Sequence, residues 1–416
     1  MKEVLKLCSL VILAWTFASM AEAGSPPTVK TEKVLYSFKG GDDGASPYAG
    51  LIFDSTGNLY GTTTEGGGQQ CSGLGVSGCG VVFELTPGSG GSWTENVIHV
   101  FNEQTDGGNP YDAPVFDSSG TLYGTTLYYG AFGSGTAWEL SPASGGTWSE
   151  SILHSFHGTT DGLFPYGLNF DPRGHLYGTT SGGGANDDGL VFQLVPRPTG
   201  HWADQVLYNF MSGTDGDSPA GVLTFDAKGN IYGTTYVGGP HLTGTVFELS
   251  KRNETAREQI LYTFQGLPFG SGPDGTNPTT GMVFDSAGNL YGTTSYGGES
   301  GVGTVYELSP DGNGTWTESV IYTFTDGTDG GHPGGLLIDQ TGNLYGATSG
   351  HNTLGSVYEL ARSSGGQWNF TVLHDFEGPD GASPEGSLVM DQAGDLYGTT
   401  AFGGENDNGV VFEVAP

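Results

Sequence analysis

Seven aspartates are the residues of this sequence whose type and spacing most directly suggest chemistry. Each begins an Asp-Gly-x-x-Pro phrase, and together they are Asp43, Asp106, Asp161, Asp215, Asp274, Asp329 and Asp380. A ring of such carboxylates could hold Ca²⁺, because calcium is bound by oxygen ligands. In the alternative interpretation Asp-Gly only makes a turn and proline fixes entry into the next strand. A turn must recur in every repeat, so we predict turn residues, with Ca²⁺ as the alternative and no other cofactor identified.

The position after each of these prolines divides the repeats into two groups. Three repeats carry Tyr48, Tyr111 and Tyr166, and the other four carry Ala220, Thr279, Gly334 and Glu385. More aromatic residues occur in loops of the second and third repeats. Aromatic rings with acidic neighbours suit stacking on sugars while carboxylates accept hydroxyl hydrogen bonds. We therefore predict a ligand-binding set of Tyr48, Tyr111, Tyr128, Tyr129, Phe164 and Tyr166. Alternatively, these rings pack beneath their own loops.

The histidines do not form a recognisable catalytic set. Three of them take a position at which other repeats have tyrosine, and we interpret these as parts of the repeat: His99, His154 and His374. Three others fall in loops that we assign to different blades: His241, His332 and His351. The sequence has no G-x-S-x-G, HExxH or P-loop motif. We therefore predict no catalytic residue.

The charge and the cysteines limit the partners and the compartment. The chain carries 45 Asp and Glu against 12 Lys and Arg, a net charge of −33. Such a surface repels phosphate backbones, which excludes nucleic acid as a partner. Cys71 and Cys79 lie close together in a Gly-rich stretch and predict a disulfide in an oxidising compartment, with a two-cysteine metal site as the alternative.

The first 23 residues have the pattern of a signal peptide. Lys2 and Lys6 precede an apolar run, and Ala21-Glu22-Ala23 matches a cleavage site. The apolar run is shorter than the roughly 20 residues that a membrane span requires. We therefore expect a secreted protein, extracellular or periplasmic, with no stable membrane insertion.

A repeated strand phrase must position all these residues. Leu/Ile-Tyr-Gly-Thr/Ala-Thr occurs with its tyrosine at Tyr60, Tyr123, Tyr177, Tyr232, Tyr291, Tyr345 and Tyr397. These tyrosines are 52 to 63 residues apart, and such a period with only strand-like segments indicates a β-propeller with one repeat per blade. The sequence thus predicts an all-β, seven-bladed propeller over residues 24–416, with four antiparallel strands per blade.

The two ends of the chain predict how the ring closes. The last repeat stops after its third strand at Val411-Phe412-Glu413-Val414, and a fourth-strand pattern precedes the first repeat in residues 32–38. We predict that this N-terminal strand completes the last blade. Five tryptophans recur at one position and predict packing between blades: Trp93, Trp148, Trp202, Trp316 and Trp368.

The repeat resembles the GloVer tandem-repeat family. The resemblance rests on the NLYGTT-like phrases, the Gly-Gly loops after them and the G-x-V-F-E-L strands, and it covers about residues 32–416. It implies an extracellular protein and carries over no activity. The Asp-x-x-Gly-Asn-Leu-Tyr phrase is more distantly similar to NHL-type propeller repeats.

Three functions remain open from the sequence. We favour a secreted, monomeric binding or scaffold module whose partner is a carbohydrate or a cell-surface protein. The alternatives are an extracellular lyase or hydrolase with a site in the central funnel, and a purely structural envelope protein. A propeller can serve each of these functions, so its fold does not choose among them.

Overall fold

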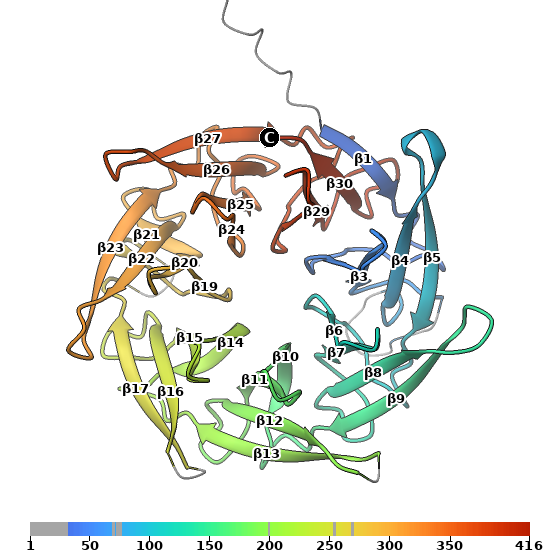
Figure 1. Cartoon of the computed structure of the whole chain (residues 1–416), viewed down its shortest axis with the longest axis horizontal. Helices are drawn as coiled ribbons and strands as arrows, with labels where there is room; N and C mark the ends of the chain where they lie inside the picture. The colour runs from blue at the N-terminus through green and yellow to red at the C-terminus, as the bar shows by residue number, and fades with distance from the viewer. Residues whose placement is uncertain (1–31, 69–70, 72–76, 199, 253–254, 268–269) are drawn as a thin grey trace, which may run out of the picture.

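The computed structural model describes residues 32–416 except 69–70, 72–76, 199, 253–254 and 268–269. Seven four-stranded antiparallel sheets form a ring (Figure 1), and β18 (Gly272–Thr276) pairs with β21 (Tyr296–Gly298) in an additional two-stranded sheet. In each blade the first strand lies nearest the centre and the fourth at the rim. The predicted fold class, seven blades and four strands per blade are therefore confirmed. The predicted signal peptide, residues 1–23, lies outside the described residues.

The first four blades follow one another directly along the chain. Blade one contains β2 (Ile52–Phe53), β3 (Leu59–Thr63), β4 (Val81–Pro87) and β5 (Trp93–Val100), with the 3₁₀ turn η1 (Ser89–Gly91) between β4 and β5. Blade two contains β6 (Val115–Phe116), β7 (Leu122–Thr126), β8 (Thr136–Pro142) and β9 (Trp148–Ser155). Blade three contains β10 (Leu163–Phe170), β11 (Leu176–Gly182), β12 (Leu190–Pro196) and β13 (Trp202–Asn209). Blade four contains β14 (Asp217–Phe225), β15 (Ile231–Val237), β16 (Thr245–Arg252) and β17 (Thr255–Thr263).

The last three blades complete the ring. Blade five contains β19 (Val283–Phe284), β20 (Leu290–Thr294), β22 (Thr304–Pro310) and β23 (Trp316–Thr323). Blade six contains β24 (Leu337–Ile338), β25 (Leu344–Thr348), β26 (Ser356–Arg362) and β27 (Trp368–Asp375). Blade seven contains β28 (Val389–Met390), β29 (Leu396–Thr400), β30 (Val410–Val414) and the N-terminal strand β1 (Glu32–Ser37).

Blade seven is closed by strands from both ends of the chain. β1 pairs antiparallel with β30, from Glu32 opposite Val414 to Ser37 opposite Val410. Phe38 follows β1 and is fully buried, with its ring 5.2 Å from that of Phe83 in blade one. The predicted closure by residues 32–38 is therefore confirmed, and it joins blade seven to blade one as well.

The first five residues of the second strand are buried in every blade because neighbours cover both faces of the strand. In β3 all five residues of Leu59–Thr63 are buried. Gly61 is required there, since a Cβ at this position would lie 2.5 Å from Cζ of Phe83 on the next strand. The glycine of the Leu-Tyr-Gly-Thr-Thr phrase thus leaves room for the aromatic residue of the third strand.

The hydrophobic core is divided among the interfaces between blades. The tyrosine of each second strand packs against the next blade. The ring of Tyr60 is 6.0 Å from that of Trp148, and the ring of Tyr123 is 5.7 Å from that of Trp202. The predicted packing of the recurring tryptophans between blades is confirmed.

Within the described part of the chain, no helix is long and apolar enough to cross a membrane.

Candidate functional site

A pocket of about 540 Å³ is lined by residues from all seven blades. The position after each repeat proline contributes one residue to its wall: Tyr48, Tyr111, Tyr166, Ala220, Thr279, Gly334 and Glu385. These residues lie at or just before the innermost strands, so closing the ring brings them together from positions far apart in the sequence. The pocket therefore lies on the propeller axis.

One side of the pocket is aromatic. The rings of Tyr48 and Tyr111 are stacked, with centroids 5.2 Å apart and an interplanar angle of 17°. Tyr166 meets Tyr111 edge-on at 6.2 Å, and Phe402 meets Tyr48 edge-on at 6.1 Å. Burial raises the pKa of Tyr111 and of Tyr166 well above the usual range. These hydroxyls therefore stay protonated and can donate hydrogen bonds at neutral pH.

Two carboxyl groups lie beside the tyrosines. Tyr111 Oη donates to Glu385 Oε2 at 3.4 Å, and burial raises the pKa of Glu385. Asp112 is surrounded by protein but keeps part of its surface open to the pocket. It accepts a hydrogen bond from the Gly167 N–H at 2.7 Å, and burial raises its pKa to about 6. The pocket thus places two acids with raised pKa values next to aromatic rings.

The opposite side of the pocket is rich in hydroxyl groups. The residue that follows the Tyr-Gly-Thr/Ala-Thr segment contributes Ser181, Tyr236, Ser295 and Ser349 in blades three to six. Thr279 Oγ1 is 3.0 Å from the Ser295 hydroxyl oxygen. Hydroxyls can both donate and accept hydrogen bonds, which suits a polar, uncharged ligand.

His332 also lines the hydroxyl side. It precedes the repeat proline with φ 52°, and the equivalent residue of every other repeat, most often Ser or Asn, also has a positive φ. The left-handed conformation therefore belongs to the repeat turn and does not distinguish His332. The ring Nδ1–H donates to the Ser295 carbonyl at 2.8 Å, and burial lowers the pKa of His332. The imidazole is therefore neutral at pH 7, with Nε2 as its acceptor.

The positions of His332 and His351 contradict the prediction that they belong to different blades. His332 and His351 were assigned to different blades, but both belong to blade six, because one lies in the loop entering it and the other in the loop between β25 and β26. Their ring centroids are 5.7 Å apart. His351 Nδ1 lies 3.1 Å from Asp326 Oδ2. The assignment was wrong because His332 lies in the Asp-Gly-x-x-Pro phrase of the sixth repeat, and His351 follows the second-strand tyrosine, Tyr345, of that same repeat.

The six predicted ligand-binding residues occupy two places. Tyr48, Tyr111 and Tyr166 line the pocket. The other three form a separate aromatic group outside its lining, in which Tyr128 lies 5.2 Å from Phe164 and 6.3 Å from Tyr129. Tyr129 also packs against the cluster that contains the two cysteines. Both groups come from the first three repeats, but only the group of Tyr48, Tyr111 and Tyr166 faces the axis.

Sequence reasoning missed several lining residues. Glu385 takes the same position as the three pocket tyrosines, so that position alone could have identified it. Asp112 lies one residue further along, in blade two only. The serines after the second strand also follow the repeat, so comparing repeats position by position would have found them.

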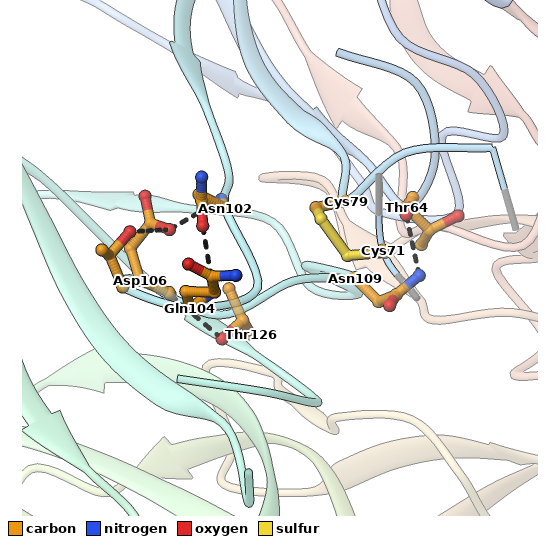
Figure 2. The surroundings of a disulfide bond; sticks show 9 residues. Thr64, Cys71, Cys79, Asn102, Gln104, Asp106, Asn109 and Thr126 are labelled. Carbon is orange, nitrogen blue, oxygen red and sulfur yellow. Dashed lines mark hydrogen bonds between the residues drawn. A yellow bond between two sulfur atoms is a disulfide. The ribbon is translucent and has the colours of Figure 1, made fainter. Parts of the chain in front are cut away.

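The seven repeat aspartates lie beside the outer strands and not in the pocket lining. Each accepts a hydrogen bond from the tyrosine or histidine near the end of the fourth strand: Tyr36, His99, His154, Tyr208, Tyr262, Tyr322 and His374. Each also accepts a backbone N–H, as Asp106 Oδ1 does from Asn102 at 2.7 Å (Figure 2). The three histidines at the tyrosine position thus serve as parts of the repeat.

Adding about millimolar Ca²⁺, or removing it with a chelator, is expected to leave the melting temperature unchanged. A cation that bound only the folded state would raise it by mass action. We expect no such rise because protein donors already satisfy the aspartates. Differential scanning calorimetry with and without Ca²⁺ measures this, and a rise that saturates with Ca²⁺ would contradict the turn interpretation.

A second acidic side chain lies beside five of these aspartates. It comes from the fourth strand and has one buried carboxyl oxygen without a hydrogen-bond partner among the described residues: Glu32, Glu95, Glu150, Glu258 and Glu318. Burial, followed by the charge of the nearby aspartate, raises the pKa of Glu95, Glu258 and Glu318 to about 7. Blade six carries Phe370 instead, stacked on Tyr322 at 4.1 Å.

Cys71 and Cys79 form a disulfide, with Cα atoms 5.2 Å apart. The disulfide lies against the loop that enters blade two, since a Cβ on Gly108 would lie 3.0 Å from Cys71 Sγ. In the same region Asn109 Nδ2 donates to the Thr64 carbonyl at 2.8 Å (Figure 2). The disulfide therefore fixes a blade-one loop beside the entry to blade two.

The ring of seven sheets and its axial pocket define an all-β propeller whose variable loops meet at the centre. The Gloeobacter/Verrucomicrobia repeat matches residues 70–271 and 259–416. The chain belongs to the Gloeobacter/Verrucomicrobia repeat family. A comparison with curated proteins found no match.

Solved structures of similar fold include extracellular propeller domains. Two of these, both from B. thetaiotaomicron, are extracellular domains assigned to hybrid two component systems. One has a TM-score of 0.59 and 13% identity, and the match covers 93% of this chain and 42% of the other. The second has a TM-score of 0.55 and 14% identity, with 92% and 41% covered. This chain therefore spans less than half the length of those domains, and the likeness concerns the fold.

Proposed function

We propose that this protein is an extracellular propeller that binds a small, uncharged carbohydrate in its axial pocket. The observation that carries the proposal is the asymmetry of the ring formed by the positions after the prolines. Three tyrosines and Glu385 occupy neighbouring blades, while small or hydroxyl-bearing residues occupy the others. A sugar has apolar C–H faces, which can stack on the tyrosine rings, and hydroxyl groups at its edges, which can form hydrogen bonds with the hydroxyl side of the pocket.

The size and charge of the pocket support the same ligand class. Its volume of about 540 Å³ lies in the range of small-molecule sites, roughly 300–1,000 Å³. Asp112 and Glu385, together with the net charge of −33, disfavour an anionic ligand. The predicted signal peptide and the fold shared with extracellular domains support a location outside the cytoplasm.

Replacing Tyr48 and Tyr111 together by alanine should weaken carbohydrate binding about tenfold or more. Each stacked aromatic contact contributes about 0.5–1.5 kcal/mol beyond burial, and about 1.4 kcal/mol corresponds to tenfold in Kd. A glycan array identifies the ligand, and isothermal titration calorimetry then measures the change in Kd.

Tyr128→Ala is the matched control, because Tyr128 is also a loop tyrosine but lies outside the pocket lining. It should leave Kd within about twofold of wild type, well below the 1.4 kcal/mol of a tenfold change. Equal losses in both variants would move the site to the other aromatic group. Glu385→Gln, which keeps the side-chain size, tests the pocket again if the double variant unfolds.

A second candidate function is a lyase or hydrolase that acts on the bound carbohydrate. It is favoured by Asp112, whose pKa of about 6 suits proton transfer near neutral pH, and by the neutral His332 across the same pocket. Asp112→Asn distinguishes the two functions. An enzyme would lose turnover of the identified glycan and keep binding, whereas a binding module has no turnover to lose. Failure of every glycan to bind would favour a structural envelope protein.

A further inference from the structure

A cluster of two histidines and one aspartate lies at the junction of blades two and three, apart from the axial pocket. His154 is near the end of β9, and His157 and Asp161 follow in the loop that crosses to β10. One potential ligand atom from each lies within 4.8 Å of the others. His154 Nε2 is 2.8 Å and His157 Nδ1 is 3.0 Å from the same oxygen, Asp161 Oδ2.

The second histidine is what distinguishes this place from the rest of the repeat. A single histidine bound to the aspartate also occurs at His99–Asp106 and at His374–Asp380, with distances of 2.7 and 2.8 Å. At the position of His157 the other repeats have Lys39, Asn102, Met211, Gln265, Thr325 and Glu377. The repeat turn therefore needs no histidine there.

We propose that His154, His157 and Asp161 bind a divalent transition-metal ion of the zinc type. Imidazole and carboxylate are the ligands that such ions take in three-residue sites, with solvent completing the coordination. Ligand atoms held about 2.0–2.2 Å from a tetrahedral ion lie about 3.4 Å from one another. Two of the three ligand–ligand distances, 2.8 and 3.0 Å, are slightly shorter than this spacing, and the third is no more than 4.8 Å.

The surroundings of the three ligands fit a metal site open on one side. Asp161 Oδ1 accepts the His157 N–H at 2.8 Å, which leaves Oδ2 to face the metal. The side chains of His154 and Asp161 are 13% and 9% exposed, whereas that of His157 is 50% exposed. The solvent side therefore lies next to His157, whose ring stacks on Phe132 at 3.8 Å.

A further carboxylate lies behind one ligand. Asp204 on β13 of blade three has Oδ1 4.0 Å from His154 Nδ1, on the side of the imidazole away from Asp161. Carboxylates in this position orient metal-bound histidines and raise their basicity. An ion bound here would connect the last strand of blade two, the crossover loop and blade three.

Zinc binding to the whole chain should show one site per molecule in isothermal titration calorimetry. The titration is done in excess Mg²⁺, which prefers oxygen ligands and occupies the many surface carboxylates. His157→Asn should lower the zinc affinity at least about tenfold, since even residues behind metal ligands contribute about 10–100-fold. Zinc should also raise the melting temperature of the wild type and not that of this variant.

The variants are chosen to place residues that other repeats have at the same position, so we expect them to fold. His157→Asn places the residue that blade two has at Asn102, and His154→Tyr places the tyrosine of Tyr36 or Tyr208, which also bonds its aspartate. His99→Tyr is the matched control and should keep zinc binding. His374→Tyr removes a ligand from the other group that could hold a metal ion, Glu32, His374 and Asp380, and should leave the site that needs His157 unchanged. Absence of saturable binding, binding unchanged by His157→Asn, or equal loss in the matched control would each overturn the proposal.

Discussion

Deleting residues 24–38 is expected to abolish cooperative folding. The deletion removes β1, the outer strand of blade seven, and exposes the backbone edge of β30. It also removes Leu35 and Phe38, which are 8% and 0% exposed and pack in one cluster with residues of blades one and seven. A propeller opened at this junction loses the interface that joins its ends, and an unpaired strand edge favours aggregation.

Circular dichroism during thermal unfolding measures this effect. Deleting residues 24–31 alone is the control, and it should leave a single sharp transition because the described strand begins at Glu32. Phe38→Ala is a milder variant that should cost about 3–5 kcal/mol, as for other buried phenylalanines. A cooperative transition at the wild-type temperature after removal of residues 24–38 would contradict the role of β1.

The free energy of unfolding should fall as the pH rises from about 4.5 to about 7. Burial raises the pKa of Glu95, Glu258 and Glu318 to about 7, above the value of 4.5 for an exposed glutamate. Between these values the folded chain binds more protons than the unfolded chain, so stability is greatest at the acidic end and is lost as the pH rises. Solvent screening reduces the effect because these side chains are partly exposed.

At lower pH the free energy of unfolding should instead fall as the pH falls, because other carboxyl groups have lowered pKa values. A different set of aspartates, among them Asp54 and Asp285, lies in the turns between the first and second strands of the blades. Hydrogen bonds that these carboxylates accept in the turn lower their pKa below 3.8. These groups stabilise the fold above pH 3.8, and their contribution is lost as the pH falls through the lowered values. The net charge of −33 adds self-repulsion at higher pH. The melting temperature should therefore be highest near pH 4 to 5.

Thermal melts between about pH 4 and 8 test this dependence. The triple variant Glu95→Gln, Glu258→Gln, Glu318→Gln should flatten the decline between pH 5 and 7, because an amide fills the same space and does not titrate. Phe370 already shows that an uncharged side chain is accepted at this position. A wild-type melting temperature that rises steadily to pH 7, or a variant with the wild-type slope, would rule out these glutamates as the cause.

Much of the candidate site could be anticipated from differences between repeats. The position after the proline selected Tyr48, Tyr111 and Tyr166, and all three line the pocket. Tyr128 and Phe164 were selected because they are aromatic residues in loops predicted for the same face, and they lie outside the lining. Residues at one position of the repeat lie at equivalent places around the axis, whereas the loop to which a residue belongs does not determine where its side chain lies.

The number of blades, the strands of each blade and the closure by residues 32–38 could all be predicted from the sequence. The repeat period, the turn residues and the alternation of apolar residues are local features of the sequence. Because they occur in all seven repeats, each repeat independently supports the prediction of a four-stranded blade. Which residues of single repeats come into contact could not be predicted, because it depends on how the blades are arranged in space. Asp112, Glu385 and His332 come from blades two, seven and six, and closure of the ring places them around one pocket. His154 and Asp161 follow the repeat, but His157 completes their cluster only because the crossover loop folds back on β9.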